Sequence, residues 1–99
     1  RDHEVEAELA LDAEGRFLGV RLTAYANMGA YLSTVAPLMG TGNFVKNVQS
    51  NYAMPAIEVR TKCLLTNTTP VSAYRGAGRP EGNYFLERLI EEAARAMGM

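Results

Sequence analysis

The segment 73–81 reads Ala-Tyr-Arg-Gly-Ala-Gly-Arg-Pro-Glu and holds the residues best suited to chemistry in this chain. Gly76 and Gly78 would let a ligand approach the backbone closely. The helix predicted to follow offers unpaired N–H groups and the positive end of its dipole, and Arg75 and Arg79 add positive charge. These features are typical of an anion-binding or cofactor-binding turn, or else of a glycine-rich loop with two solvated arginines. The segment matches neither a Walker loop nor a dinucleotide-binding fingerprint.

Length and composition restrict the kind of protein that could carry this segment. The 99 residues suffice for one small domain, and 47% apolar with 21% charged residues is ordinary globular composition. Ten basic and eleven acidic residues leave a formal charge of −1, which argues against a nucleic-acid-binding surface. No apolar run approaches the ~18 residues of a membrane span. No signal or lipidation motif is present, and we expect a cytoplasmic protein.

The chain has only one cysteine and one histidine. The one cysteine, Cys63, cannot form an internal disulfide, and the one histidine, His3, cannot build a metal site alone, so no metal ligand is predicted. We expect His3 on the charged face of a strand and Cys63 in the inner row of another, where it would act as a small core residue. Met28, Met39 and Met54 flank loops, and we expect them to be exposed in the isolated chain and to favour its self-association.

Alternation of apolar and polar residues predicts three strands. Residues 3–12 alternate apolar residues with carboxylates and are predicted to form a β-hairpin with residues 17–26 through a turn that contains a glycine. In the second strand, alternation places Leu18 with the other aliphatic side chains and Phe17 on the opposite face. A third strand is predicted at residues 57–66, after a proline.

Two helices complete the predicted fold. A short middle helix is expected around residues 44–48, and a C-terminal helix starts at Pro80, which the first turn of a helix tolerates. The order strand, strand, helix, strand, helix predicts an α+β fold. We expect the hairpin and third strand to form a small, mostly antiparallel sheet with an exposed edge, covered by an amphipathic C-terminal helix. The apolar stripe of that helix is Phe85, Leu86, Leu89, Ile90, Ala93 and Met97, and its charged face pairs Arg88 with Glu92 and Glu91 with Arg95.

The segment 73–81, together with Tyr-Phe-Leu-Glu-Arg at 84–88, strongly resembles the molybdenum hydroxylase family. That family contains xanthine dehydrogenase, aldehyde oxidases and oxidoreductases, and the large subunits of carbon monoxide dehydrogenase-like enzymes. The resemblance spans essentially the whole chain and implies that residues 1–99 are a single fragment of the molybdopterin-binding domain of a longer large subunit. Further matches lie, in order, at Met28-Gly29-Ala30-Tyr31, at Asn51-Tyr52 with Pro55, and at Thr66-Asn67.

The resemblance also implies a cofactor, a reaction and partners. The cofactor is molybdenum with molybdopterin, held by the longer protein and not expected on the isolated fragment. The reaction is hydroxylation of a carbon centre with oxygen from water, and the electrons leave through iron–sulfur and FAD subunits or domains. In family members the arginine of this motif approaches the metal's ligands through its backbone N–H, a donor that does not titrate. Carried over, the cofactor-binding residues are Arg75, Gly76, Ala77 and Gly78.

Two positions depart from particular relatives. Gly76 stands where true carbon monoxide dehydrogenases carry a cysteine that holds copper, which argues against copper-assisted oxidation of carbon monoxide. Ala77 stands where xanthine dehydrogenases carry a phenylalanine that packs on the purine. Without that ring a purine loses a stacking contact of roughly 0.5–1.5 kcal/mol, so the expected substrate is an aldehyde or an N-heterocycle.

The family's catalytic glutamate lies near the far end of the large subunit, outside this resemblance. We therefore predict no catalytic residue in the chain and expect the isolated fragment to be inactive. Two other classes of function remain open at this point. One is a stand-alone interaction module whose helix and apolar loops dock a partner. The other is a phosphate- or nucleotide-binding domain that uses Arg75, Arg79 and the start of the C-terminal helix.

Overall fold

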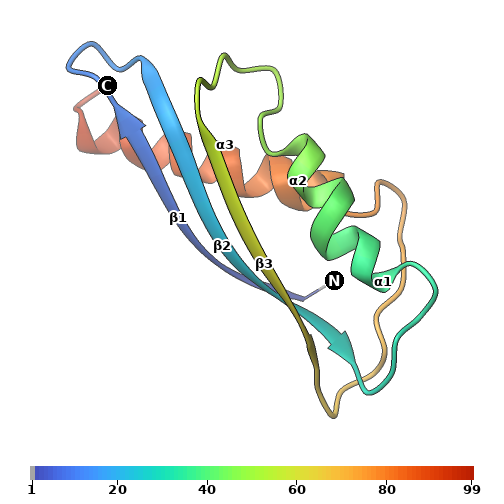
Figure 1. The fold of residues 1–99 in the computed structure, drawn as a ribbon. Helices are drawn as coiled ribbons and strands as arrows, with labels where there is room; N and C mark the ends of the chain where they lie inside the picture. The colour runs from blue at the N-terminus through green and yellow to red at the C-terminus, as the bar shows by residue number, and fades with distance from the viewer. Residues whose placement is uncertain (1) are drawn as a thin grey trace.

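A computed structural model describes residues 2–99 and shows a three-stranded sheet with a helical layer on one face (Figure 1). The helical connection between the second and third strands contains a π-helical turn, η1, between two short α-helices. Within the described residues no helix combines the length and apolarity that crossing a bilayer requires. The elements in chain order are β1 (His3–Leu11), β2 (Phe17–Gly29), α1 (Ala36–Leu38), η1 (Met39–Asn43), α2 (Phe44–Asn47), β3 (Ile57–Leu65) and α3 (Arg79–Ala96).

The α+β class is confirmed, and the sheet is mixed. β1 and β2 form the predicted antiparallel hairpin, and its turn is fixed by the Asp12 carboxylate, which accepts the N–H groups of Glu14 and Arg16. β3, by contrast, pairs in parallel with β2. The sheet is therefore not mostly antiparallel, because the connection from residue 30 to residue 56 is long enough to return the chain to the starting end of β2. β1 and β3 are both edge strands, as expected.

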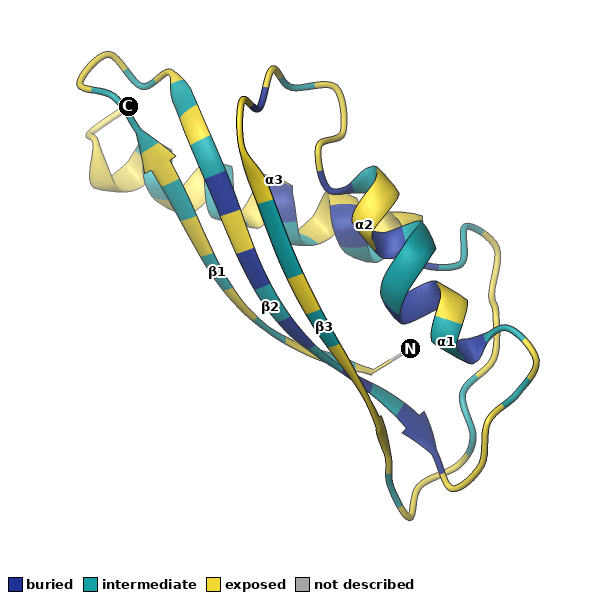
Figure 2. Cartoon of the chain, viewed as in Figure 1, coloured by how far each residue is buried: buried dark blue, intermediate teal, exposed yellow. Residues whose placement is uncertain are grey.

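The main core lies between the inner face of the sheet and the helices α2 and α3 (Figure 2). Leu22 from β2, Phe44 and Val48 from the α2 segment, and Leu86 from α3 are fully buried. The ring of Phe44 meets the ring of Phe85 edge-on, with centroids 5.8 Å apart. Burial of apolar surface in this layer is what fixes α3 against the sheet.

The start of α3 matches its prediction closely. The helix begins at Arg79, with Pro80 in its first turn, and keeps Leu86 buried while its charged face is exposed. The two ion pairs that were predicted are present, at 3.6 Å for Arg88–Glu92 and 2.7 Å for Arg95–Glu91. Both pairs are about half exposed, so each contributes little to stability.

A β-bulge reverses the predicted facing of two residues at the start of β2. Ala10 pairs with Gly19 and Leu11 pairs with Phe17, so Leu18 is the extra residue. Phe17 consequently packs against the core, whereas Leu18 is 51% exposed. The predicted faces of Phe17 and Leu18 were wrong because simple alternation does not account for an inserted residue.

The structure also corrects the predicted surroundings of the reactive residues and the methionines. Cys63 faces η1 as its predicted inner row implies, since a Cβ at Gly40 would lie 3.7 Å from its sulfur, but it is exposed because it lies in the edge strand β3. His3 lies on the inner face of β1, half-buried, with its ring centroid 6.1 Å from that of Phe44. Alternate residues of a strand point to the same face, and His3 lies two residues before the inward-facing Val5. The three methionines expected at the surface, Met28, Met39 and Met54, are buried core residues.

We expect His3 to make stability depend on pH. Burial lowers the pKa of its imidazole below the ordinary value of 6.5, and Glu81 opposes that shift. The unfolded state therefore binds more protons, and the stability that His3 contributes is present above pH 6.5 and lost as the pH falls through the lower folded-state pKa. Urea denaturation across this range should show a decline in the free energy of unfolding that His3→Gln abolishes. An equal decline in the variant would contradict this assignment.

Candidate cofactor-binding site

The loop before α3 consists of two overlapping β-turns. In the first, the N–H of Ala77 donates to the carbonyl of Tyr74 over 2.8 Å, and Gly76 at the third position has φ +97°. This is the pattern of a type II turn. In the second, the N–H of Arg79 donates to the carbonyl of Gly76 over 3.1 Å, with Ala77 and Gly78 at φ +43° and +104°. Two successive positive φ values define a type I′ turn.

Gly78 brings the loop into direct backbone contact with η1. A Cβ at Gly78 would lie 2.4 Å from the carbonyl oxygen of Met39 and 3.1 Å from the backbone nitrogen of Phe44. One turn further on, a Cβ at Gly82 would lie 3.3 Å from the Phe44 carbonyl oxygen. These distances leave no room for a side chain at Gly78, so the glycine serves the packing of the loop as well as its conformation.

The four predicted binding residues lie together in this loop but differ in exposure. Arg75 is exposed, Gly76 and Ala77 are half-buried, and Gly78 is buried. The side chain of Ala77 packs against a second apolar cluster made by β2, α1 and η1. Because a non-glycine residue at positive φ is unfavourable by about 1–2 kcal/mol, this packing helps to hold Ala77 in its left-handed conformation. The cluster consists of Ala26, Met28, Ala36 and Met39, with Val71 and Ala77 against it.

The loop offers backbone donors rather than metal-ligating side chains. Between residues 2 and 99, no acceptor is found for the N–H groups of Gly76 and Gly78. No group of three or more His, Cys, Asp or Glu side chains that could hold a metal ion occurs in the same described part of the chain. Backbone N–H groups in left-handed turns favour anionic and oxygen-rich groups. The donor set therefore fits a cofactor that carries such oxygens.

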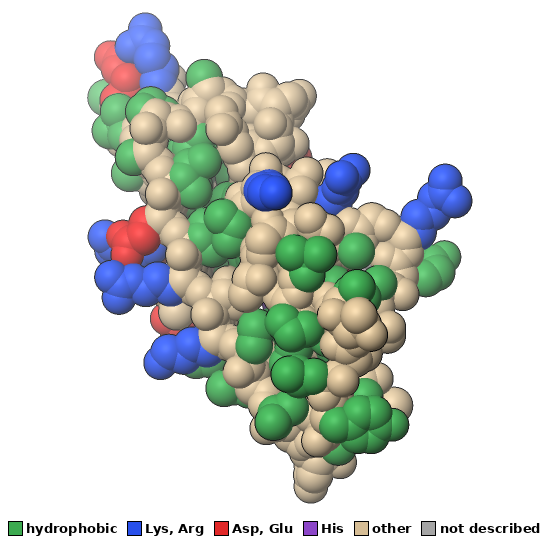
Figure 3. All heavy atoms as spheres, turned by 45° about the vertical axis from the view of Figure 1, so that its right-hand side comes forward, with side chains coloured by type: hydrophobic (Ala, Val, Ile, Leu, Met, Phe, Trp, Pro, Cys, Tyr) green, Lys and Arg blue, Asp and Glu red, His purple; other side chains and the backbone are tan. Residues whose placement is uncertain are grey.

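Apolar side chains surround the loop at the surface. Figure 3 shows hydrophobic side chains gathered over the lower half of the face that it brings forward. Four large residues from α1, the end of β3 and the connection after β2 are more than half exposed, and so is Tyr74, at 74%, in the loop itself. This apolar surface is well suited to contact with another part of a larger protein. The five residues are Tyr31, Leu32, Leu38, Leu65 and Tyr74.

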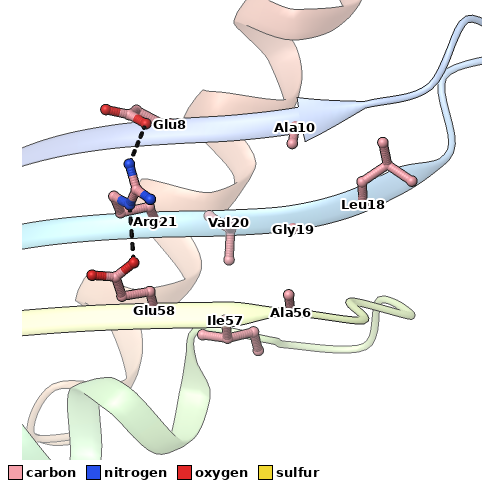
Figure 4. A pocket seen from close by; sticks show the side chains of 9 residues that line it. All are labelled: Glu8, Ala10, Leu18, Gly19, Val20, Arg21, Ala56, Ile57 and Glu58. Atoms are coloured by element: carbon pink, nitrogen blue, oxygen red, sulfur yellow. Dashed lines mark hydrogen bonds and ion pairs between the residues drawn. The ribbon is translucent and has the colours of Figure 1, made fainter.

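A separate depression of about 380 Å³ opens on the outer face of the sheet, close to the hairpin (Figure 4). Its polar rim is Arg21, which donates to Glu58 over 3.0 Å and to Glu8 over 3.3 Å. The hydrogen bond from Arg21 is the main reason why the pKa of Glu58 lies below its ordinary value. Since two carboxylates neutralise the charge of Arg21, this depression is less suited to an anionic group than the loop before α3.

Sequence reasoning missed one polar cluster near the loop. The side chain of Asn27 bonds to Asp2, just before β1, and to Thr66 and Thr68, in the segment that follows β3. Thr66 was predicted only as the last residue of the third strand and as part of a matching motif. No local pattern links these residues, because the threonines lie 39 and 41 positions from Asn27 in the chain.

The fold and the donor loop together define the chain as part of a cofactor-binding domain. It belongs to the molybdopterin cofactor-binding domain family, whose model matches residues 1–99. The resemblance to the molybdenum hydroxylases, which are oxidoreductases, is thereby confirmed, and the cofactor of this domain is molybdenum with molybdopterin.

Relatives match nearly all of the chain. It is 39% identical over 94 residues to the gamma subunit of the 6-hydroxypseudooxynicotine dehydrogenase complex of Paenarthrobacter nicotinovorans, covering 93% of this chain and 12% of that protein. It is 29% identical to the carbon monoxide dehydrogenase large chain of Hydrogenophaga pseudoflava, covering 100% and 13%. The crystal structure of quinoline 2-oxidoreductase from Pseudomonas putida 86 matches with a TM-score of 0.89 at 31% identity, covering 100% and 13%. The chain thus spans only about an eighth of the length of these relatives.

The contact of Gly78 with η1 leads to a test with a matched control. Gly78 and Gly98 both have positive φ, but a Cβ at Gly98 meets nothing within 4 Å. We expect Gly98→Ala to cost at most about 1–2 kcal/mol of unfolding free energy, from backbone strain alone. Gly78→Ala adds the clash with Met39 and should cost roughly 2–5 kcal/mol. Equal losses in thermal or urea denaturation would show that the close approach is not important.

Proposed function

We propose that this chain helps to hold the molybdenum–molybdopterin cofactor in the large subunit of a molybdenum hydroxylase. The residues that hold it are Arg75, Gly76, Ala77 and Gly78, and residues 1–99 form one piece of the molybdopterin-binding domain. The observation that carries the proposal is the N–H group of Gly76, which finds no acceptor among the described residues although two turns fix the conformation of the loop. Family membership supplies the ligand that this donor fits.

The loop acts by holding and orienting. When bound, the cofactor supplies a redox-active molybdenum centre for hydroxylation with oxygen from water. The backbone N–H groups of Arg75 and Gly76 would donate hydrogen bonds to oxygen atoms of the cofactor, and these donors keep their protons at any working pH. Because the two turns fix their direction before the cofactor arrives, little reorganisation is needed on binding. Gly78 and Ala77 anchor the loop on η1 and its apolar cluster.

The substrate we propose is an aldehyde or an N-heterocycle. Ala77 presents no aromatic ring on which a purine could stack, and its methyl group packs toward the core. Two relatives of at least 31% identity, quinoline 2-oxidoreductase and the large subunit of nicotine 6-hydroxylase from Paenarthrobacter nicotinovorans, carry names that refer to N-heterocycles. Of the two proposed substrate classes, these names favour the N-heterocycle over the aldehyde.

The partners we propose are the rest of the large subunit and, for electron transfer, iron–sulfur and FAD subunits or domains of a cytoplasmic complex. The names of the relatives, such as subunit gamma and large chain, support an assembly of several subunits. The apolar surface beside the loop, which includes Tyr31 and Tyr74, supports contact with the rest of the large subunit. Family membership favours this proposal over a stand-alone interaction module and over a phosphate- or nucleotide-binding domain.

Proline at position 75 tests the backbone donor directly. Arg75 is the second residue of the type II turn, a position at which proline is favoured, so Arg75→Pro removes the N–H and keeps the turn. In the full-length subunit we expect this variant to lose roughly 10²-fold in kcat and to contain less molybdenum per subunit. Arg75→Ala keeps the N–H and should stay close to the unaltered enzyme in both measurements. If the alanine variant loses as much as the proline variant, the side chain is the functional group and the proposal fails.

The isolated chain should not turn over substrate, because the family's catalytic glutamate is predicted outside it. Incubation of purified residues 1–99 with aldehydes or N-heterocycles and an electron-accepting dye should give no dye reduction above the blank. Reduction that depends on the substrate would contradict the proposal that this chain only helps to hold the cofactor.

A further inference from the structure

We propose that Asn27 is a positioning residue for the cofactor-binding loop, a role that rests on the function proposed above. Asn27 lies near the end of β2 and is half-buried. Residues 66–71, here named the approach segment, lead from β3 toward the loop at 73–78. The hydrogen bonds of Asn27 fasten this approach segment to the sheet.

The carboxamide of Asn27 uses its full hydrogen-bonding capacity. Its Nδ2 donates to Asp2 Oδ2 over 3.0 Å and to Thr68 Oγ1 over 2.9 Å. Its Oδ1 accepts the Gly29 N–H over 2.8 Å and the Thr66 hydroxyl over 2.6 Å. A carboxamide has two N–H donors and two acceptor lone pairs, and each of them has a partner here. One side chain thus joins the start of β1, the end of β2 and the approach segment.

Backbone contacts hold the same segment against the end of β2. The N–H of Thr66 donates to the Gly29 carbonyl over 3.0 Å, and the N–H of Val71 donates to the Met28 carbonyl over 3.3 Å. Gly29 has φ +81°, and a Cβ there would lie 2.4 Å from Cα of Pro70. The approach segment therefore lies directly on the backbone of β2. The Asn27 side chain adds two bonds to it, one to Thr66 and one to Thr68.

The loop is anchored at both ends as a result. Gly78 fixes its far end on η1, and the approach segment fixes its near end, two residues before Ala73. Loss of the Asn27 side chain would leave the Gly29 N–H without its acceptor, and it would leave the hydroxyls of Thr66 and Thr68 bonded to each other but no longer to β2. Since unmet hydrogen-bonding groups favour local opening, the near end of the loop would then be free to move.

Hydrogen exchange in the full-length subunit tests this role. In the cofactor-free subunit we expect Asn27→Ala to speed amide exchange in peptides covering residues 66–78 by about tenfold. The control is Asp12→Ala, which removes the carboxylate that accepts two N–H groups in the hairpin turn, at the opposite end of the sheet. It should speed exchange around the hairpin and leave residues 66–78 unchanged. Molybdenum content per subunit after cofactor loading should fall in the Asn27 variant only.

Swapping the side chains of Asn27 and Asp2 tests whether their hydrogen bond matters. If Asn27 only filled space, the second substitution would not restore what the first one lost. Asn27→Asp places a carboxylate against Asp2, and we expect exchange in residues 66–78 to rise. Adding Asp2→Asn restores a donor at that contact, while the Thr68 hydroxyl can donate to the new carboxylate. The double variant should return close to the unaltered protein. If Asn27→Ala does not fold, Thr68→Val applies the same test, because it removes the bond from Asn27 Nδ2 to the approach segment together with the bond between the Thr66 and Thr68 hydroxyls.

Two results would overturn the role of Asn27. One is unchanged exchange in residues 66–78 after its removal, and the other is an equal rise in that region in the Asp12 control. A failure of the proposed function would look different. In that case exchange would respond as expected, but the unaltered subunit would bind no molybdenum or would bind it regardless of the Arg75 N–H.

Discussion

The direct contact between the backbone of Gly78 and the backbone of η1 is the constraint on which the site depends. A Cβ at Gly78 would lie 2.4 Å from the Met39 carbonyl oxygen, so the chain can pass at this point only as glycine. The contact sets where α3 begins and forces the preceding residues into two tight turns with positive φ at Gly76, Ala77 and Gly78. These two turns leave the N–H groups of Gly76 and Gly78 without acceptors among the described residues. The proposed cofactor-binding role requires such donors.

The same constraint explains why the surrounding elements are built as they are. The helical connection must bring η1 to the loop, and it does so because Phe44 and Val48 bury their side chains beneath the sheet. That connection also carries the chain back to the starting end of β2, which makes β3 a parallel strand. The opposite face of the sheet carries exposed ion pairs such as Arg21–Glu58, which add little stability.

Local periodicity was sufficient for the hairpin and for α3, since both are encoded by residues close in sequence. It failed where distant residues decide the outcome. The parallel pairing of β3, the exposure of Cys63 and the burial of Met28 depend on how the connection crosses the sheet. The four loop residues came from a motif together with a family resemblance. The Asn27 cluster had no sequence signal, because its partners Thr66 and Thr68 lie 39 and 41 positions away.

The most direct measurement is a crystal structure of the full-length subunit with its molybdenum cofactor bound. We predict that the loop keeps its two turns and that the backbone nitrogen of Arg75 or Gly76 lies within about 3 Å of an oxygen ligand of the cofactor. A structure in which both nitrogens are remote from the cofactor, and bond to protein or solvent groups instead, would contradict the role assigned to this loop.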